Sequence, residues 1–206
     1  MCYDSVRRRI VMFGGVLDNS GWSNQTWEWD GKRWYLMRSA ISPAARAYHA
    51  MCYDSVRQRS VMYGGNHTDT WEWDGKAWVR TLAAAPQGPK NRAVMAFDWG
   101  RRRTVLAMGE PNSGGSYEYD GFSWTISTRP TDINSGSAMV YDSARQRLVM
   151  FAGLTLGRWS SRNNVTHERI GTTWRYYFYP APSGRERHAM AYDSHRRCIV
   201  MFGGMG

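Results

Sequence analysis

Residues 51–65 read MCYDSVRQRSVMYGG, and this stretch decides the fold because the chain repeats it. The same pattern returns without a gap as MCYDSVRRRIVMFGG at 1–15, MAFDWGRRRTVLAMG at 95–109, MVYDSARQRLVMFAG at 139–153 and MAYDSHRRCIVMFGG at 190–204. Successive copies start 50, 44, 44 and 51 residues apart. A period of this size indicates a protein built from repeated structural units.

A second repeated segment follows four of the five copies. It reads TWEWDGKRW at 26–34, TWEWDGKAW at 70–78, SYEYDGFSW at 116–124 and, in a degraded form, THERIGTTW at 166–174. Trp27 and Trp29 alternate with polar residues, and Asp30-Gly31 is a typical hairpin turn. The segment predicts two antiparallel strands.

The first segment also predicts a hairpin. Residues 50–53 form one strand, Asp-Ser-x-Arg forms the turn, and the apolar run before the glycine pair forms the second strand. That run is apolar at consecutive positions, as at 10–13 and 148–151, which is typical of a strand buried on both faces. Each repeat therefore predicts four antiparallel strands, the pattern of a β-propeller blade.

The glycine pair, the aromatic residue before Asp and the aromatic residues of the second segment resemble the kelch repeat over nearly the whole chain. The resemblance implies an all-β kelch-type propeller in a single domain, 1–206. Its blades would cover about 1–45, 46–89, 90–133 and 134–184, with a C-terminal half blade at 185–206. Copies three and four depart from the pattern, with Met108-Gly109 and Ala152-Gly153 at the glycine pair and His167 and Arg169 in place of aromatic residues.

The repeats also account for the composition. The formal net charge is +10 and 14% of the residues are aromatic, a pairing that is compatible with nucleic-acid binding. However, the repeated turn alone contains many of the cations, namely Arg7, Arg8, Arg9, Arg57, Arg59, Arg101, Arg102, Arg103, Arg145, Arg147, Arg196 and Arg197. An Asp in each turn is expected to accept their hydrogen bonds. The alternative, a ring of arginines for a polyanion, is less favoured, so nucleic acid is not the expected partner.

The sequence contains no apolar run long enough for a membrane span and no recognisable export signal. Three cysteines, Cys2, Cys52 and Cys198, lack the spacing of a disulfide framework or a zinc site. We therefore expect a soluble, cytoplasmic protein without a membrane partner.

Propellers close by packing the last blade on the first. The fifth copy has no second segment, which leaves three interpretations. The chain is part of a longer propeller, or it forms four blades with a spare hairpin, or its terminal hairpins are exchanged between copies in a homo-oligomer.

The links of variable length are the expected binding face, because the repeated turns hold the blades together. In kelch proteins this face binds partners, so the resemblance implies an interaction module for a protein partner or a polar or anionic small ligand. Guanidinium groups and aromatic rings suit a sugar acid or an acidic peptide. The candidate ligand-binding residues are Trp22, Arg46, Tyr48, Asn66, His67, Asp69, Arg92, Asn112, Arg158, Trp159, Arg162, Arg185 and Arg187.

The favoured interpretation, an interaction module, is not an enzyme. The alternative interpretation is a small hydrolase. His49 and His188 share one repeat position, and with His67 they are weak candidates for a metal site that activates water. They are also the candidate catalytic residues. Histidine is common at this position of kelch repeats, where it serves structure. No cofactor-binding motif is present, so no cofactor is expected.

Overall fold

The computed structural model describes residues 1–18, 21–84, 86, 92–108, 115–127, 135–154, 161–178 and 180–206. In these ranges the regular secondary structure is entirely β-strand. Among them we find no helix with the length and apolar character of a membrane span. The all-β class predicted from the sequence is confirmed.

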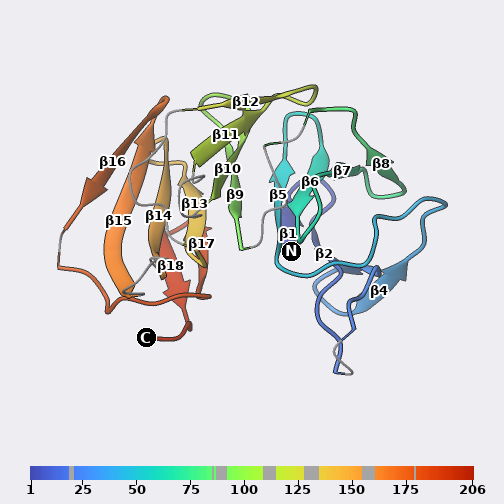
Figure 1. Ribbon diagram of the computed structural model, residues 1–206, viewed down its shortest axis with the longest axis horizontal. Helices are drawn as coiled ribbons and strands as arrows, with labels where there is room; N and C mark the ends of the chain where they lie inside the picture. The colour runs from blue at the N-terminus through green and yellow to red at the C-terminus, as the bar shows by residue number, and fades with distance from the viewer. Residues whose placement is uncertain are drawn as a thin grey trace. The chain divides into compact units, whose positions relative to one another are not determined.

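Four sheets have four antiparallel strands each, joined in chain order (Figure 1). The first contains β1 (Cys2–Asp4), β2 (Arg9–Phe13), β3 (Thr26–Trp29) and β4 (Trp34–Met37). The second contains β5 (His49–Asp54), β6 (Arg59–Gly64), β7 (Thr70–Trp73) and β8 (Trp78–Arg80). The third contains β9 (Val94–Asp98), β10 (Arg103–Met108), β11 (Gly115–Tyr119) and β12 (Trp124–Ile126).

The fourth sheet contains β13 (Ala138–Asp142), β14 (Arg147–Leu154), β15 (Arg162–Ile170) and β16 (Thr173–Tyr177), and β17 (Ala189–Asp193) pairs with β18 (Cys198–Phe202) in a separate hairpin. This repeated four-stranded arrangement is consistent with a propeller-like β fold.

The chain divides into two compact units. The first comprises Met1–Asn91 with Asp120–Trp124, and the second comprises Arg92–Tyr119 with Thr125–Gly206. A buried apolar cluster in the first unit contains Val11, Phe13, Met51, Met62, Trp71, Trp73 and Trp78. A buried apolar cluster in the second unit contains Ala96, Val105, Ala107, Met139, Tyr141, Leu148 and Met150. The second strand of each repeat supplies core residues in both units, as its apolar run predicts.

The repeated turn is built around its aspartate. In the first turn one carboxylate oxygen of Asp4 accepts the backbone N–H groups of Val6 and Arg7, at 3.1 and 3.0 Å. The other oxygen accepts the Arg7 guanidinium at 2.7 Å. Asp54 and Asp142 make the same three kinds of hydrogen bond. The predicted role of these aspartates is confirmed.

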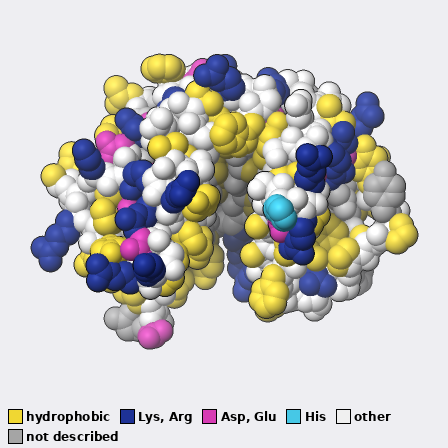
Figure 2. Space-filling model, turned by 180° about the vertical axis from the view of Figure 1, so that it is seen from behind, with side chains coloured by type: hydrophobic (Ala, Val, Ile, Leu, Met, Phe, Trp, Pro, Cys, Tyr) yellow, Lys and Arg dark blue, Asp and Glu magenta, His cyan; other side chains and the backbone are white. Residues whose placement is uncertain are grey.

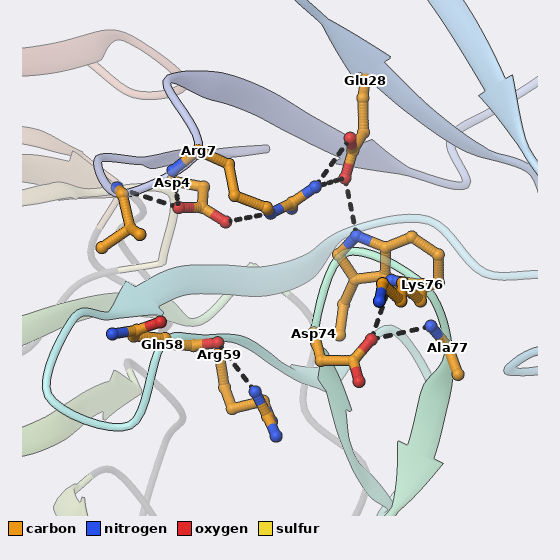
Figure 3. Close-up of polar contacts among 10 residues, drawn as sticks. Asp4, Arg7, Glu28, Gln58, Arg59, Asp74, Lys76 and Ala77 are labelled. Carbon is orange, nitrogen blue, oxygen red and sulfur yellow. Dashed lines mark hydrogen bonds and ion pairs between the residues drawn. The ribbon is translucent and has the colours of Figure 1, made fainter.

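The turn arginine also reaches the glutamate of the third strand. Figure 3 shows Arg7 between Asp4 and Glu28, and its Nη1 donates to both Glu28 oxygens at 2.7 and 2.8 Å. Arg57, Arg101 and Arg145 bind Glu72, Glu118 and Glu168 at the corresponding positions. Each sheet therefore ties its turn to its third strand with a charged contact.

The same glutamate binds a residue of the following repeat. The Trp73 indole donates to Glu28 at 2.8 Å. In the second unit Arg169, which replaces the aromatic residue of the pattern, donates to Glu118 instead. Arg169 is fully buried. At this repeat position the guanidinium of Arg169 therefore replaces the indole of Trp73 as the hydrogen-bond donor to the glutamate.

The tryptophan that opens the fourth strand makes a second recurrent contact. The indoles of Trp78 and Trp124 each donate at 2.8 Å, to the hydroxyls of Thr26 and Thr70 respectively. Trp174 donates to the Ser116 hydroxyl at 3.2 Å. These side chains bury large apolar rings while satisfying their one donor. Most tryptophans at repeat positions thus serve the core rather than a binding platform.

Candidate functional site

Two predicted ligand contacts in the first unit bind each other. The Arg46 side chain is fully buried, and its guanidinium donates to Asp69 at 2.7 and 3.2 Å and to the Gly64 carbonyl at 3.2 Å. Burial opposes ionisation of Asp69, but hydrogen bonds from Arg46 and Trp71 hold its pKa below the ordinary value. This pair fixes the link before β5 to the link before β7.

His49 lies at the start of β5 with its ring edge on Phe13, at 5.8 Å between centroids. Burial, followed by nearby positive charge, lowers the pKa of His49 to about 3, so the ring is neutral at pH 7. His67 belongs to the same unit, whereas His188 belongs to the other. Among the residues that the structure describes, no three His, Cys, Asp or Glu side chains group as metal ligands do.

Three further candidates in the first unit have solvent-exposed side chains. Tyr48 is 51% exposed and Trp22 is 37% exposed. Asn66 is exposed as well, and both Tyr48 and Asn66 adopt a positive φ, at 59° and 66°. They lie on links between strands, where the sequence predicts the binding face.

The described residues of the first unit line hollows on its surface. One, of about 580 Å³, is lined by Arg7, Arg9, Glu28, Tyr35, Met37 and Gly75. Its guanidinium groups already pair with Asp4, Glu28 and Asp30. Another, of about 480 Å³, is lined by Thr68, Asp69, Arg80, Thr81, Leu82 and Ala83 and includes the predicted contact Asp69.

In the second unit Arg185 is the repeat equivalent of Arg46. It donates to the carbonyls of Ser183 and Gly203, both at 3.1 Å, and therefore holds its own link. His188 is 7% exposed and packs edge-on against Phe151. Burial, and then the charge of Arg185, lower the pKa of His188.

Three other predicted contacts converge on one buried carboxylate. Glu186 is 4% exposed, and it lies 4.0 Å from Arg92, 3.6 Å from Arg162 and 3.7 Å from Arg187, measured between oxygen and nitrogen. The arginine side chains keep 34%, 38% and 49% of their surface exposed. We call these four residues the Glu186 cluster.

Backbone hydrogen bonds hold the cluster in place. The Gly136 N–H donates to the Arg92 carbonyl at 3.5 Å, and the Arg187 N–H donates to the Gly136 carbonyl at 2.8 Å. These three residues occupy one repeat position, and all have a positive φ of 57°, 74° and 59°. Gly136 leaves room for Glu186, since a Cβ there would lie 3.3 Å from that of Glu186.

The cluster carries more positive than negative charge. The separations from Glu186 exceed an ordinary hydrogen-bond length, so the Arg162 and Arg187 ion pairs leave guanidinium N–H groups that can also bind another acceptor. One Glu186 oxygen is buried without a hydrogen bond within the described part of the chain. Guanidinium forks bind the two oxygens of a carboxylate or phosphate. The arrangement is therefore suited to a small anion or an acidic side chain.

Sequence reasoning selected the three arginines but missed Glu186 and Gly136. The repeat offered no signal for Glu186, because the same position holds Ala47, Asn91 and Ser135 in copies two to four. Three predicted contacts, Asn112, Arg158 and Trp159, lie outside the described residues.

Positive charge is not confined to the cluster. On the face shown in Figure 2, Lys and Arg side chains are spread over the surface, with acidic and apolar side chains among them.

Neither a family model nor a curated protein matches the chain. Among solved structures, the structure of YjhT is similar, with a TM-score of 0.74 and 14% sequence identity. The match covers 95% of this chain and 74% of YjhT. At this identity the similarity shows the fold alone.

Proposed function

We propose that the chain is a kelch-type β-propeller module of four blades and a half blade that binds an anionic ligand through its variable-link face. The observation that supports this most directly is the convergence of Arg92, Arg162 and Arg187 on Glu186. Arg92 and Arg187 lie on links between repeats, whereas Arg162, expected on a link, is the first residue of β15, so the three come from separate segments of the chain. Their meeting brings three partly exposed guanidinium groups to one place, at separations from Glu186 that are longer than a hydrogen bond.

The ligand is a molecule or peptide side chain that carries a carboxylate or phosphate. Glu186 fixes the arginines from the buried side, and the anion binds them from the exposed side. Because Glu186 cancels part of the charge, it limits affinity and favours a ligand that also makes polar contacts over a simple ion.

Titration with glucuronate, followed by calorimetry, tests the proposal, with neutral glucose as the matched ligand. We expect glucuronate to bind and glucose not to bind. Arg162→Gln and Arg187→Gln each weaken glucuronate binding at least about tenfold, the effect of losing one charge-assisted hydrogen bond. Glu186→Gln strengthens binding several-fold, because it removes the competing negative charge.

Arg80→Gln is the control, since Arg80 is an exposed arginine on β8 in the other unit. It should leave glucuronate affinity unchanged. Equal binding of glucuronate and glucose, or an equal loss in the Arg80 variant and the cluster variants, would contradict an anion site at Glu186.

A further inference from the structure

One face of the first sheet is apolar across all four strands. Cross-strand partners point to the same face of a sheet, and the register pairs Tyr3 with Ile10, Ile10 with Trp29, and Trp29 with Trp34. Met12, Trp27 and Leu36 form the adjacent row. Tyr3, Trp34 and Leu36 are 56%, 41% and 42% exposed. We call these seven residues the first-sheet face.

The equivalent face of the second sheet is buried against the first sheet. Its large residues Tyr53, Met62, Trp71, Trp73 and Trp78 are 9%, 0%, 7%, 1% and 2% exposed. Trp78 packs on Phe13 at 5.3 Å between ring centroids and donates to Thr26. This face of the repeat is therefore built to be covered by the opposite face of another repeat.

The hairpin β17–β18 displays such an opposite face. Val200 and Phe202 occupy the repeat positions of Val11 and Phe13, which are 0% and 2% exposed. On the hairpin the same positions are 41% and 84% exposed. Ala189 and Ala191 pair with Phe202 and Val200 and complete a small apolar surface.

The contacts within each unit indicate how the two surfaces fit. Phe202 would pack on Trp34 as Phe13 packs on Trp78. The Tyr3 hydroxyl would accept a turn N–H of the hairpin, as Tyr141 accepts that of Gly100 at 3.0 Å and Tyr192 that of Ala144 at 3.2 Å. Both surfaces thus carry the side chains that this repeat already uses for packing.

We propose that the first-sheet face of one molecule binds the β17–β18 hairpin of a second copy, through the apolar surface formed by Ala189, Ala191, Val200 and Phe202. The contact is head-to-tail, because each surface is complementary to the other and not to itself. The proposal goes beyond anion binding, since the Glu186 cluster contributes no residue to either surface.

Two charge substitutions test the contact by light-scattering mass. The wild-type protein should have at least twice the 23.7 kDa mass of one chain. Trp34→Asp removes the first-sheet face and Phe202→Asp removes the hairpin face, so each variant alone should be monomeric. Mixed together, they should form a dimer, because the mixture retains one intact copy of each surface.

Val79→Asp is the control, since Val79 is 57% exposed on β8 and lies on neither surface. It should assemble as the wild type does, and far-ultraviolet circular dichroism should show that all variants are folded. A wild-type mass of one chain would overturn the proposal. Assembly of the Phe202 variant alone would overturn it in favour of pairing between two first-sheet faces.

Discussion

At the scale of single residues, a side chain that the sequence predicts as a ligand contact can have a structural role instead. Arg46 has such a role, because its carboxylate partner, Asp69, belongs to the same chain. Arg46 and Arg185 share a repeat position and donate to carbonyls at equivalent positions, but within the described residues only Arg46 also binds a carboxylate. A buried charge that loses its partner is costly, because the remaining charge is left desolvated.

Replacement of the Arg46 side chain measures that cost. We expect Arg46→Met to lower the free energy of unfolding by about 3–5 kcal/mol, since Asp69 is left without its guanidinium partner. The double variant Arg46→Met/Asp69→Asn should recover part of the loss. Arg185→Met, which removes hydrogen bonds to two carbonyls and to the Ser183 hydroxyl but, among the described residues, no carboxylate contact, should cost about 1 kcal/mol. Urea unfolding measures all three, and equal losses at Arg46 and Arg185 would contradict the argument.

At the scale of the element, the repeated hairpin contains a strained backbone position. The turn residues Arg8, Gln58, Arg102, Gln146 and Arg197 all have a positive φ, between 51° and 57°. Side chains with a Cβ are disfavoured in this left-handed region, where glycine is not.

Gln58→Gly should therefore raise the free energy of unfolding by about 0.5–1 kcal/mol, because glycine relieves the strain. The adjacent change Arg59→Gly is the matched control. Arg59 lies in β6 with extended backbone, so glycine there should lower stability by about 0.5–1 kcal/mol. Urea midpoints of the two variants should move in opposite directions, and a shared direction would refute the strain argument.

The strands of these hairpins were predictable because alternation, turn residues and repetition agree. The aspartate contacts were predictable too, since Asp4 and Arg7 are three residues apart. The pairing of Arg7 with Glu28 required the register between strands, which local sequence does not specify. The Glu186 cluster was harder still to predict from the sequence, because Arg92, Arg162 and Arg187 meet only through the packing of separate repeats. Their residue types indicated an anion site, but their common position did not follow from the sequence.

At the scale of the whole molecule, repeated charge pairs make stability depend on pH. Burial opposes ionisation of Asp4, Glu118 and Asp142, yet hydrogen bonds to their arginines hold the pKa of each below its ordinary value. Their stabilisation is present above the unfolded pKa values, near 4, and is lost as the pH falls further. Asp98 acts in the opposite direction, because burial raises its pKa.

His49 extends the acid sensitivity to milder pH. Its pKa is about 3 in the folded chain against an ordinary 6.5, so between these values the unfolded chain binds the additional proton. Stability therefore falls as the pH decreases below 6.5, by about 2 kcal/mol from this group at pH 5. His188 has the same sign, because its pKa is also lowered.

His49→Gln removes the first of these contributions. We expect the urea midpoint of the variant, followed by tryptophan fluorescence, to change less between pH 7.5 and 5 than that of the wild type. The remaining change belongs to His188, and a second substitution, His188→Gln, should remove it. Below pH 4 wild type and variants should lose stability together, since the aspartate and glutamate pairs are common to all of them. If the urea midpoint of the His49→Gln variant changed between pH 7.5 and 5 by as much as that of the wild type, the prediction would be wrong. His49 would then be protonated in the folded chain as easily as in the unfolded chain.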